Sequence, residues 1–278
     1  NNGFTHFYFD AITGDLNGNG YDNIIAAWES SNNSINIVIT EVDRNNLSWD
    51  DEKVLTLTNV LFNNPDNYNA FRFRIIKGFF DKDPQPEFAL AYWNSSGNIE
   101  IKIFDIDPNS LTPVEKATIA DEYLNPSLDN SGLYDIAAGD FDGDLLDEIV
   151  LAAYNQYGQN DWAIYTKVYD YVEDNSSYSL IPKVKKDDFY TSDDFWGISY
   201  VINNLAVAAG DFKNNTLDEI VVDFVVYNNS SEARNYILPA SINLTMDTLN
   251  VDQNKVLEMY LVNGSSNLNI GVITADIN

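Results

Sequence analysis

The segment IAAGDFDGDLLDEIVLAAY, at residues 136–154, sets the pattern for the whole chain. Related segments recur at residues 12–28 (ITGDLNGNGYDNIIAAW), 75–93 (IIKGFFDKDPQPEFALAYW) and 207–224 (VAAGDFKNNTLDEIVVDF), and a fifth copy opens at 272–278 (VITADIN). A fixed period of this length indicates a repeat architecture. The small residue before the loop falls at intervals of 64, 61, 71 and 65 residues, at Gly14, Gly78, Gly139, Gly210 and Ala275.

Each copy carries the patterns of four β-strands. A first strand mixes apolar and small residues (3–14, 70–79, 132–141, 203–212), and after a polar loop comes a mainly apolar run (24–28, 88–93, 149–154, 220–227). Such runs are typical of strands buried on both faces. Segments such as 34–42 and 98–106 then alternate apolar and polar residues, which indicates half-buried strands. A fourth strand is expected at 53–60, 116–120, 178–183 and 254–262.

Four strands in a repeating unit of this length predict one blade of a β-propeller. We therefore expect an all-β chain that forms one propeller domain over residues 1–278, with blades at approximately 3–68, 69–130, 131–202 and 203–267 and the first strand of a fifth at 268–278. A β-sandwich or a β-solenoid is the alternative. Solenoid coils are much shorter than these units, and a sandwich does not need four copies of one loop.

Composition excludes several classes of function. The 278 residues include 15 Lys and Arg against 43 Asp and Glu, a net charge of −28, which disfavours binding to nucleic acid or anionic lipid. There is no Cys and a single His, so thiol nucleophiles, disulfides and His-cluster metal sites are excluded. No apolar run approaches the roughly 18 residues of a membrane helix, so we expect no membrane insertion.

The loops after the first strands point to calcium. The third loop (DFDGDLLDE, 140–148) and the first (DLNGNGYDN, 15–23) place oxygen-bearing side chains at positions 1, 3, 5 and 9. Calcium prefers six to eight oxygen ligands, which a tightly turning loop of this kind provides. An EF-hand would need an acid at position 12, where Ala26 and Leu151 stand. The alternative is a set of Asx-turns without metal, but the clustered acids of the third loop would then repel one another.

The repeats resemble the FG-GAP repeats of integrin α-subunit propellers and related bacterial VCBS-type repeats. The shared motifs are GDFDGD (139–144) with DEIV (147–150), GDF (210–212) with DEIV (218–221), and GD (14–15) with DNII (22–25), and the resemblance covers all four copies. It implies a larger ring, such as one of seven blades, of which this chain would be a fragment. The alternative is that the last strand, at 269–278, helps to close a smaller ring. The resemblance also implies calcium at Asp15, Asn17, Asn19, Tyr21 (backbone) and Asn23, and at Asp140, Asp142, Asp144, Leu146 (backbone) and Glu148.

Two loops depart from this pattern. The second loop (79–87) has Phe79 at position 1 and Lys82, Pro84 and Pro86 within it, and the fourth (211–219) has Lys213 at position 3. We predict that neither binds calcium and that Lys213 pairs instead with Asp211 or Glu219. The first loop has neutral Asn at positions 3, 5 and 9, so we expect weaker binding there than in the third.

The opposite face of the expected propeller is the candidate ligand surface. Its longest connection, 185–196, contains Phe189, Tyr190, Phe195 and Trp196, and exposed aromatic side chains often anchor protein or sugar partners. The alternative is that these side chains only cover the core. Arg72 and Arg74 share one face of an innermost strand, where they would either hold an anion in the channel or pair with channel acids.

The sequence thus favours a calcium-stabilised module for binding, adhesion or assembly in an extracellular or cell-surface protein, without catalysis of its own. Its expected partner is a protein or a glycan on the face opposite the calcium loops. The alternatives are a carbohydrate-binding, lectin-like propeller and a polysaccharide-active enzyme that uses paired carboxylates. With 43 acids, the sequence does not single out such a pair.

Overall fold

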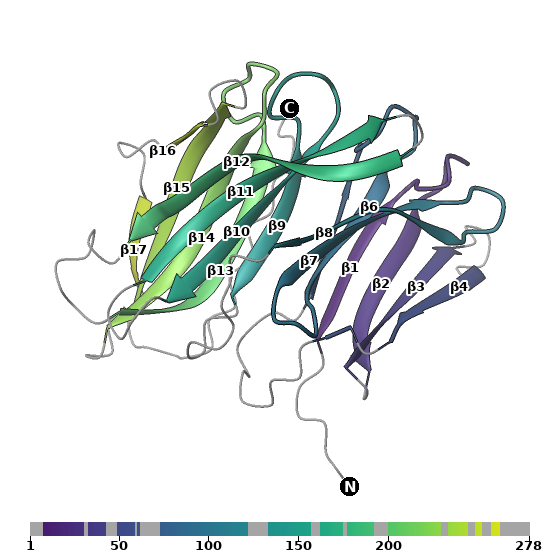
Figure 1. Cartoon of the computed structure of the whole chain (residues 1–278), viewed down its shortest axis with the longest axis horizontal. Coiled ribbons are helices and arrows are strands. Elements are labelled where there is room, and N and C mark those ends of the chain that lie inside the picture. Colours follow the sequence, from purple (N-terminus) through teal and green to yellow (C-terminus); the bar gives the residue numbers. More distant parts are fainter. Residues whose placement is uncertain are drawn as a thin grey trace, which may run out of the picture. The chain divides into compact units, whose positions relative to one another are not determined.

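The computed structural model describes residues 8–30, 33–42, 49–58, 60–61, 73–121, 133–156, 162–174, 177–191, 200–228, 233–243, 248–251 and 257–261. Within these ranges the chain contains strands and no helix, which confirms the all-β prediction. The strands build four antiparallel sheets, each in chain order (Figure 1). The fifth copy of the repeat lies outside the described residues.

The first sheet consists of β1 (Phe9–Gly14), β2 (Asn23–Ser30), β3 (Ser34–Val42) and β4 (Trp49–Leu57). The second consists of β5 (Phe73–Gly78), β6 (Glu87–Trp93), β7 (Ile99–Ile106) and β8 (Pro113–Asp121). The third consists of β9 (Tyr134–Gly139), β10 (Glu148–Gln156), β11 (Trp162–Asp174) and β12 (Ser177–Thr191). The fourth consists of β13 (Tyr200–Gly210), β14 (Glu219–Asn228) and β15 (Ala233–Asn243), with β16 (Thr248–Val251) and β17 (Leu257–Leu261) both paired to β15.

The predicted strands are found, with corrections at their ends. Every first strand stops at the glycine, so residues 79, 140–141 and 211–212 belong to the loops. The fourth strand expected at 254–262 is found as β17, and a further strand that was not expected, β16, precedes it and also pairs with β15. The expected connection at 185–196 is also too long, because β12 continues to Thr191. β12 is the outer strand of its sheet, and an edge strand tolerates the charged residues that had indicated a loop.

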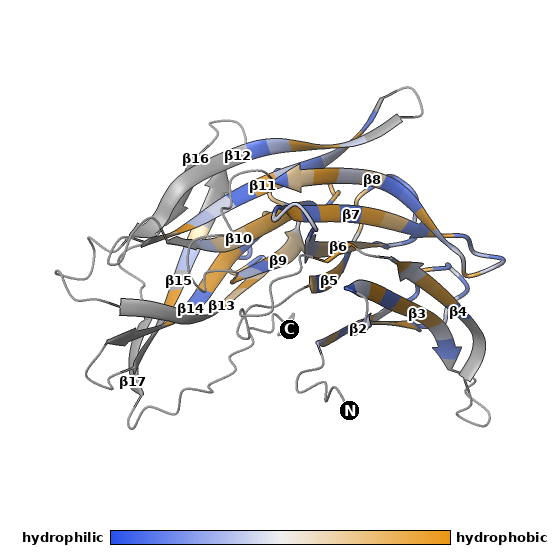
Figure 2. Cartoon of the chain, turned by 60° about the horizontal axis from the view of Figure 1, so that its bottom comes forward, coloured by the Kyte–Doolittle hydropathy of each residue, from blue (hydrophilic) through white to orange (hydrophobic). Residues whose placement is uncertain are grey.

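Burial explains why these segments form strands. Every residue of β6 is buried, as expected for a strand covered on both faces, whereas β7 alternates between buried and half-buried residues along most of its length. Figure 2 shows β3 and β7 as hydrophobic ribbons interrupted by hydrophilic bands. The rings of Phe88 and Phe104 stack with their centroids 5.0 Å apart, so adjacent strands also pack side chain on side chain.

The chain divides into two compact units, one of Asn1–Asn125 with Tyr171–Leu180 and one of Pro126–Asp170 with Ile181–Asn278. Within each unit the first strands of two successive sheets are joined by the same hydrogen bond. Asp10 Oδ2 accepts from Ile75 N at 3.1 Å in the first unit, and Asp135 Oδ2 accepts from Val207 N at 2.9 Å in the second. Both aspartates lie four residues before the loop glycine. The repeat therefore reproduces both the sheets and the contact between successive sheets.

Candidate metal sites in the loops after the first strands

The four loops at 15–23, 79–87, 140–148 and 211–219 each connect the first and second strands of a sheet, and position 9 is always the first residue of the second strand. The side chain at position 9 is buried in all four. One of its oxygens accepts a backbone amide from position 2 or 3, which closes the loop. These bonds are Leu16 N to Asn23 Oδ1 (3.1 Å), Phe80 N to Glu87 Oε2 (2.8 Å), Phe141 N to Glu148 Oε2 (2.8 Å) and Lys213 N to Glu219 Oε2 (3.1 Å).

The third loop brings three carboxylates together. Asp140, Asp142 and Glu148 each offer an oxygen, and these oxygens lie within 4.8 Å of one another. Asp142 is exposed, whereas Glu148 is only 2 % exposed, so the group opens to solvent on one side and is buried on the other. An arrangement of this kind suits a cation that prefers oxygen ligands.

The electrostatics of the third loop also favour a positive charge. Burial, with a contribution from the nearby charges of Asp142 and Asp170, raises the pKa of Glu148 to about 8. Burial and the neighbouring Asp144 likewise raise the pKa of Asp142 above its usual value. Asp170 lies on β11, where the strand register continued by one residue places it opposite Glu148, and Lys183 Nζ binds Asp170 Oδ2 at 2.9 Å. The sequence analysis missed Asp170, because only the strand register brings it to the loop.

Asx-turns account for part of this loop but not for all of it. Asp140 accepts the amides of Gly143 (2.6 Å) and Leu145 (3.1 Å), and Asp144 accepts the amide of Leu146 (2.9 Å). These bonds require no metal. Backbone amides also hold the other two acids, since Asp142 accepts the amide of Asp144 (3.1 Å) and Glu148 that of Phe141 (2.8 Å). Repulsion among the three carboxylates nevertheless opposes their approach unless a proton or a cation neutralises it.

The first loop has the same backbone turns with fewer charges. Asp15 accepts the amides of Asn19 (3.0 Å) and Gly20 (2.8 Å), and Asn19 Oδ1 accepts the amide of Tyr21 (2.8 Å). Asn17 and Asn23 are buried. The Asn23 oxygen accepts the amide of Leu16, and the amide nitrogen Nδ2 of Asn23 is buried without a hydrogen-bond partner.

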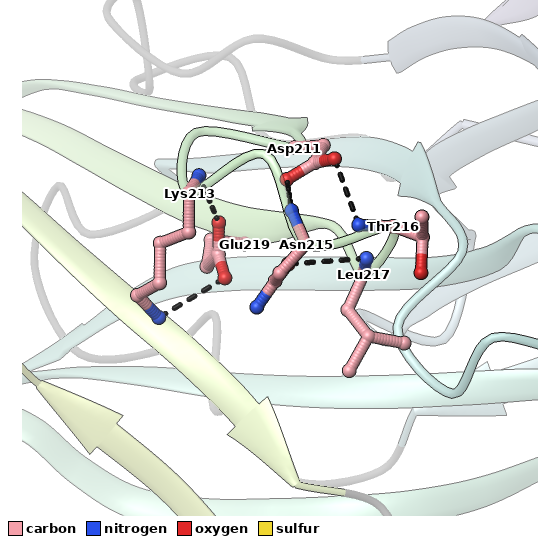
Figure 3. A network of polar contacts seen from close by, with 6 residues as sticks. All are labelled: Asp211, Lys213, Asn215, Thr216, Leu217 and Glu219. Carbon is pink, nitrogen blue, oxygen red and sulfur yellow. Dashed lines mark hydrogen bonds and ion pairs between the residues drawn. The ribbon is translucent and has the colours of Figure 1, made fainter.

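The fourth loop carries its own positive charge (Figure 3). Lys213 Nζ donates to Glu219 Oε1 at 3.0 Å, which confirms that Lys213 pairs with one of the two acids predicted for it. Asp211 instead accepts the amides of Asn215 and Thr216, both at 2.9 Å. The residue opposite Glu219 in β15 is Ser241, so no further acid joins this loop from the third strand.

The second loop holds an acidic group that the sequence analysis did not select. Asp81, Asp83 and Glu87, at positions 3, 5 and 9, offer carboxylate oxygens within 4.8 Å of one another. Burial, together with the charges of Asp81 and Asp83, raises the pKa of Glu87 to about 8. The signal was present in the spacing of the three acids, but the missing acid at position 1 outweighed it. Two acidic groups, one in the second loop and one in the third, could therefore hold a metal ion.

The candidate ligand residues elsewhere are only partly described. Arg72, Phe195 and Trp196 lie outside the described residues, and Phe189 and Tyr190 belong to β12. Arg74 lies on β5, and its positive charge lowers the pKa of Asp10, although burial raises it more. This charge interaction agrees with the structural alternative, in which Arg74 pairs with an acid of an innermost strand.

No protein-family model matches the sequence, and the search among curated proteins also found no match. The described part of the chain contains no helix that is long and apolar enough to cross a membrane.

Proposed function

We propose that this chain is a calcium-stabilised β-propeller module that serves binding, adhesion or assembly in an extracellular or cell-surface protein, without catalysis of its own. The observation that carries the proposal is the convergence of Asp140, Asp142 and Glu148 in the third loop. The fourth loop supports it, because there a lysine supplies the positive charge beside the glutamate at position 9.

Calcium fits the third loop better than other common ions. The ligands are carboxylates, and the loop offers further oxygens in Asp144 at position 5 and in the backbone carbonyl at position 7. Hard cations prefer such oxygens, and calcium accepts six to eight of them in irregular geometry. Loops of extracellular modules typically bind calcium with dissociation constants of about 10⁻⁴–10⁻³ M, which matches a structural role outside the cell.

The radial arrangement of a propeller is supported by contacts within each unit. The first strands of successive sheets lie beside each other there, β1 beside β5 and β9 beside β13. In a propeller the first strands line the axis, so neighbouring blades approach each other most closely at these strands. The repeated bonds of Asp10 and Asp135 would then hold adjacent blades together.

A binding role follows from what such a scaffold offers. Rigid sheets carry loops at both ends, and loops on a rigid scaffold are frequent binding sites. Calcium would fix the loops at one end, so we place the protein or glycan partner at the opposite end, where the connections rich in Asn, Ser and aromatic residues occur.

Thermal unfolding in calcium and in EGTA tests the proposal. With calcium at about 100 times its dissociation constant, binding to one site stabilises the folded state by about 2.7 kcal/mol, a rise in Tm of about 5–10 °C. The Asp142→Ala variant should show a smaller rise, whereas Asp211→Asn, in the lysine-containing fourth loop, should respond as the wild type does. Equal Tm values for the wild type with and without calcium would show the assignment to be wrong.

A further inference from the structure

The second loop lacks a backbone hydrogen bond that the other three loops share, and both of its partners are replaced. In the other three loops the aspartate at position 1 accepts the amide of position 6, from Gly20 (2.8 Å), Leu145 (3.1 Å) and Thr216 (2.9 Å). In the second loop Phe79 stands at position 1 and Pro84, which has no amide hydrogen, at position 6. The donor and the acceptor are lost together, so this loop does not need a carboxylate at position 1 to fold.

The buried glutamate of this loop has an oxygen without a partner. Glu87 is 1 % exposed, and its Oε2 accepts the amide of Phe80 at 2.8 Å. Its other oxygen, Oε1, is buried and accepts no hydrogen bond. Burying a carboxylate oxygen without a partner is costly unless a proton or a cation neutralises it.

Two further carboxylates are held beside Glu87. The amide of Asp83 donates to Asp81 Oδ1, and the amide of Gln85 donates to Asp83 Oδ1, each at 2.8 Å. These bonds fix the two side chains while their carboxylates lie within 4.8 Å of that of Glu87. Backbone amides thus hold Asp81 and Asp83 with a carboxylate oxygen of each close to that of Glu87.

Lys116 on the fourth strand acts on Asp83 through its charge, but it forms its ion pair with another acid. Asp105 on β7 follows Phe104, which pairs with Phe88, so it lies across from Glu87. Lys116 Nζ on β8 binds Asp105 Oδ2 at 3.2 Å, so its charge is shared with that acid. In the fourth loop, by contrast, Lys213 reaches the equivalent oxygen of Glu219 directly.

We propose that the second loop binds a hard divalent cation, Ca²⁺ or Mg²⁺, through Asp81, Asp83 and Glu87, with water completing the coordination shell. Three carboxylates and no nitrogen or sulfur ligand select this class of ion. The buried Oε1 of Glu87 is the ligand that the loop cannot satisfy by itself. This site is separate from the one proposed for the third loop, and the proposal departs from the sequence-based expectation that the second loop binds no calcium.

Titration calorimetry with CaCl₂, and separately with MgCl₂, tests the proposal by counting bound ions. Asp83→Asn, a change at an exposed position, should lower the count by one relative to the wild type, and Glu87→Gln should lose the same ion. The matched control is Asp211→Asn, an acid of the lysine-containing loop, which should leave the count unchanged. Loss of one ion in either titration supports the proposal and names the ion.

An unchanged count in both titrations for Asp83→Asn and Glu87→Gln overturns the proposal. Asp142→Asn tests ion binding by the third loop independently, because the two sites share no ligand. If Asp142→Asn loses an ion and Asp83→Asn does not, the third loop binds and the second does not. The reverse result supports the second loop and contradicts the proposed function of the third.

Discussion

The third and fourth loops end in the same buried glutamate, but different groups face it. Glu219 meets the ammonium of Lys213 at 3.0 Å, whereas Glu148 faces the carboxylates of Asp140 and Asp142. The third strands of the two sheets differ in the same sense, because the acid Asp170 is opposite Glu148 and the uncharged Ser241 is opposite Glu219. The two loops therefore differ at position 3 and on the third strand, and we expect position 3 to have the larger influence on whether the loop needs a cation from solution.

This comparison shows which part of the loop is scaffold and which part is site. The aspartate at position 1 accepts the amide of position 6 in both loops, and a second amide from position 4 in the third loop and from position 5 in the fourth. We therefore expect these bonds to hold the loop whichever positive charge faces the glutamate. Position 3 is aspartate in the third loop and lysine in the fourth, while the glutamate at position 9 is the same in both. Exchanges at position 3 should therefore convert one loop into the other.

The largest effect is expected from Lys213→Asp, which gives the fourth loop acids at positions 1, 3 and 9. In EGTA the buried Glu219 loses its ion pair, which should cost about 2–3 kcal/mol and lower Tm by about 5–10 °C. Calcium should restore most of this loss, and calorimetry should count one more ion than in the wild type.

Lys82→Met is the control for Lys213→Asp, since Lys82 is an exposed lysine of the second loop at position 4. It should change the free energy of unfolding by less than about 0.5 kcal/mol, so Tm should stay close to that of the wild type. If Lys213→Asp lowered Tm without any response to calcium, position 3 would not be what distinguishes the two loops.

The converse change, Asp142→Lys, should make the third loop independent of calcium. The new ammonium would neutralise Glu148 as Lys213 neutralises Glu219, so Tm in EGTA should rise by about 2–6 °C, for about 1–2 kcal/mol. Thermal unfolding with and without calcium measures both effects. A variant that is less stable in EGTA than the wild type would contradict the equivalence of the two loops.

A smaller effect is expected from pH in the calcium-free protein. Burial raises the pKa of Glu148 to about 8 from its usual 4.5, so the folded state keeps a proton that the unfolded chain releases. The resulting stability is fully present below pH 4.5 and is lost as the pH rises toward 8. Tm in EGTA should therefore fall over this range, and the stabilisation by calcium should grow.

Glu148→Gln separates this contribution to the pH dependence from that of the other acids, because the amide does not titrate. Its Tm in EGTA should fall less steeply between pH 5 and 8 than that of the wild type. Equal slopes for the two proteins would show that Glu148 is ionised in the folded state throughout this range.

The sequence predicted the features that local pattern determines. Alternation placed β3 at Ser34–Val42, and the apolar runs located the buried strands such as β6. The lysine at position 3 predicted an ion pair with Asp211 or Glu219, which belong to the same short loop, and the pair is with Glu219.

The features that the sequence did not reveal depend on contacts between segments. Asp105 and Asp170 join the second and third loops only through the register of the third strand with the second. The acidic group at Glu87 was missed for a different reason. Position 1 was weighed as a ligand, whereas in the other loops its carboxylate binds backbone amides, and Pro84 removes the need for it.

The smallest effect concerns position 6 of the third loop, where Leu145 has φ +73° and is 84 % exposed. The first loop has Gly20 there, with φ +84°. Leu145→Gly removes a left-handed strain of about 1–2 kcal/mol but adds about 0.5–1 kcal/mol of unfolded-state entropy, a net gain of about 0.5 kcal/mol. Because the amide that binds Asp140 remains, ion counts should not change. Leu146→Gly, at a position without this strain, should lower Tm instead, and a fall in Tm for both variants would mean that the left-handed turn costs Leu145 nothing.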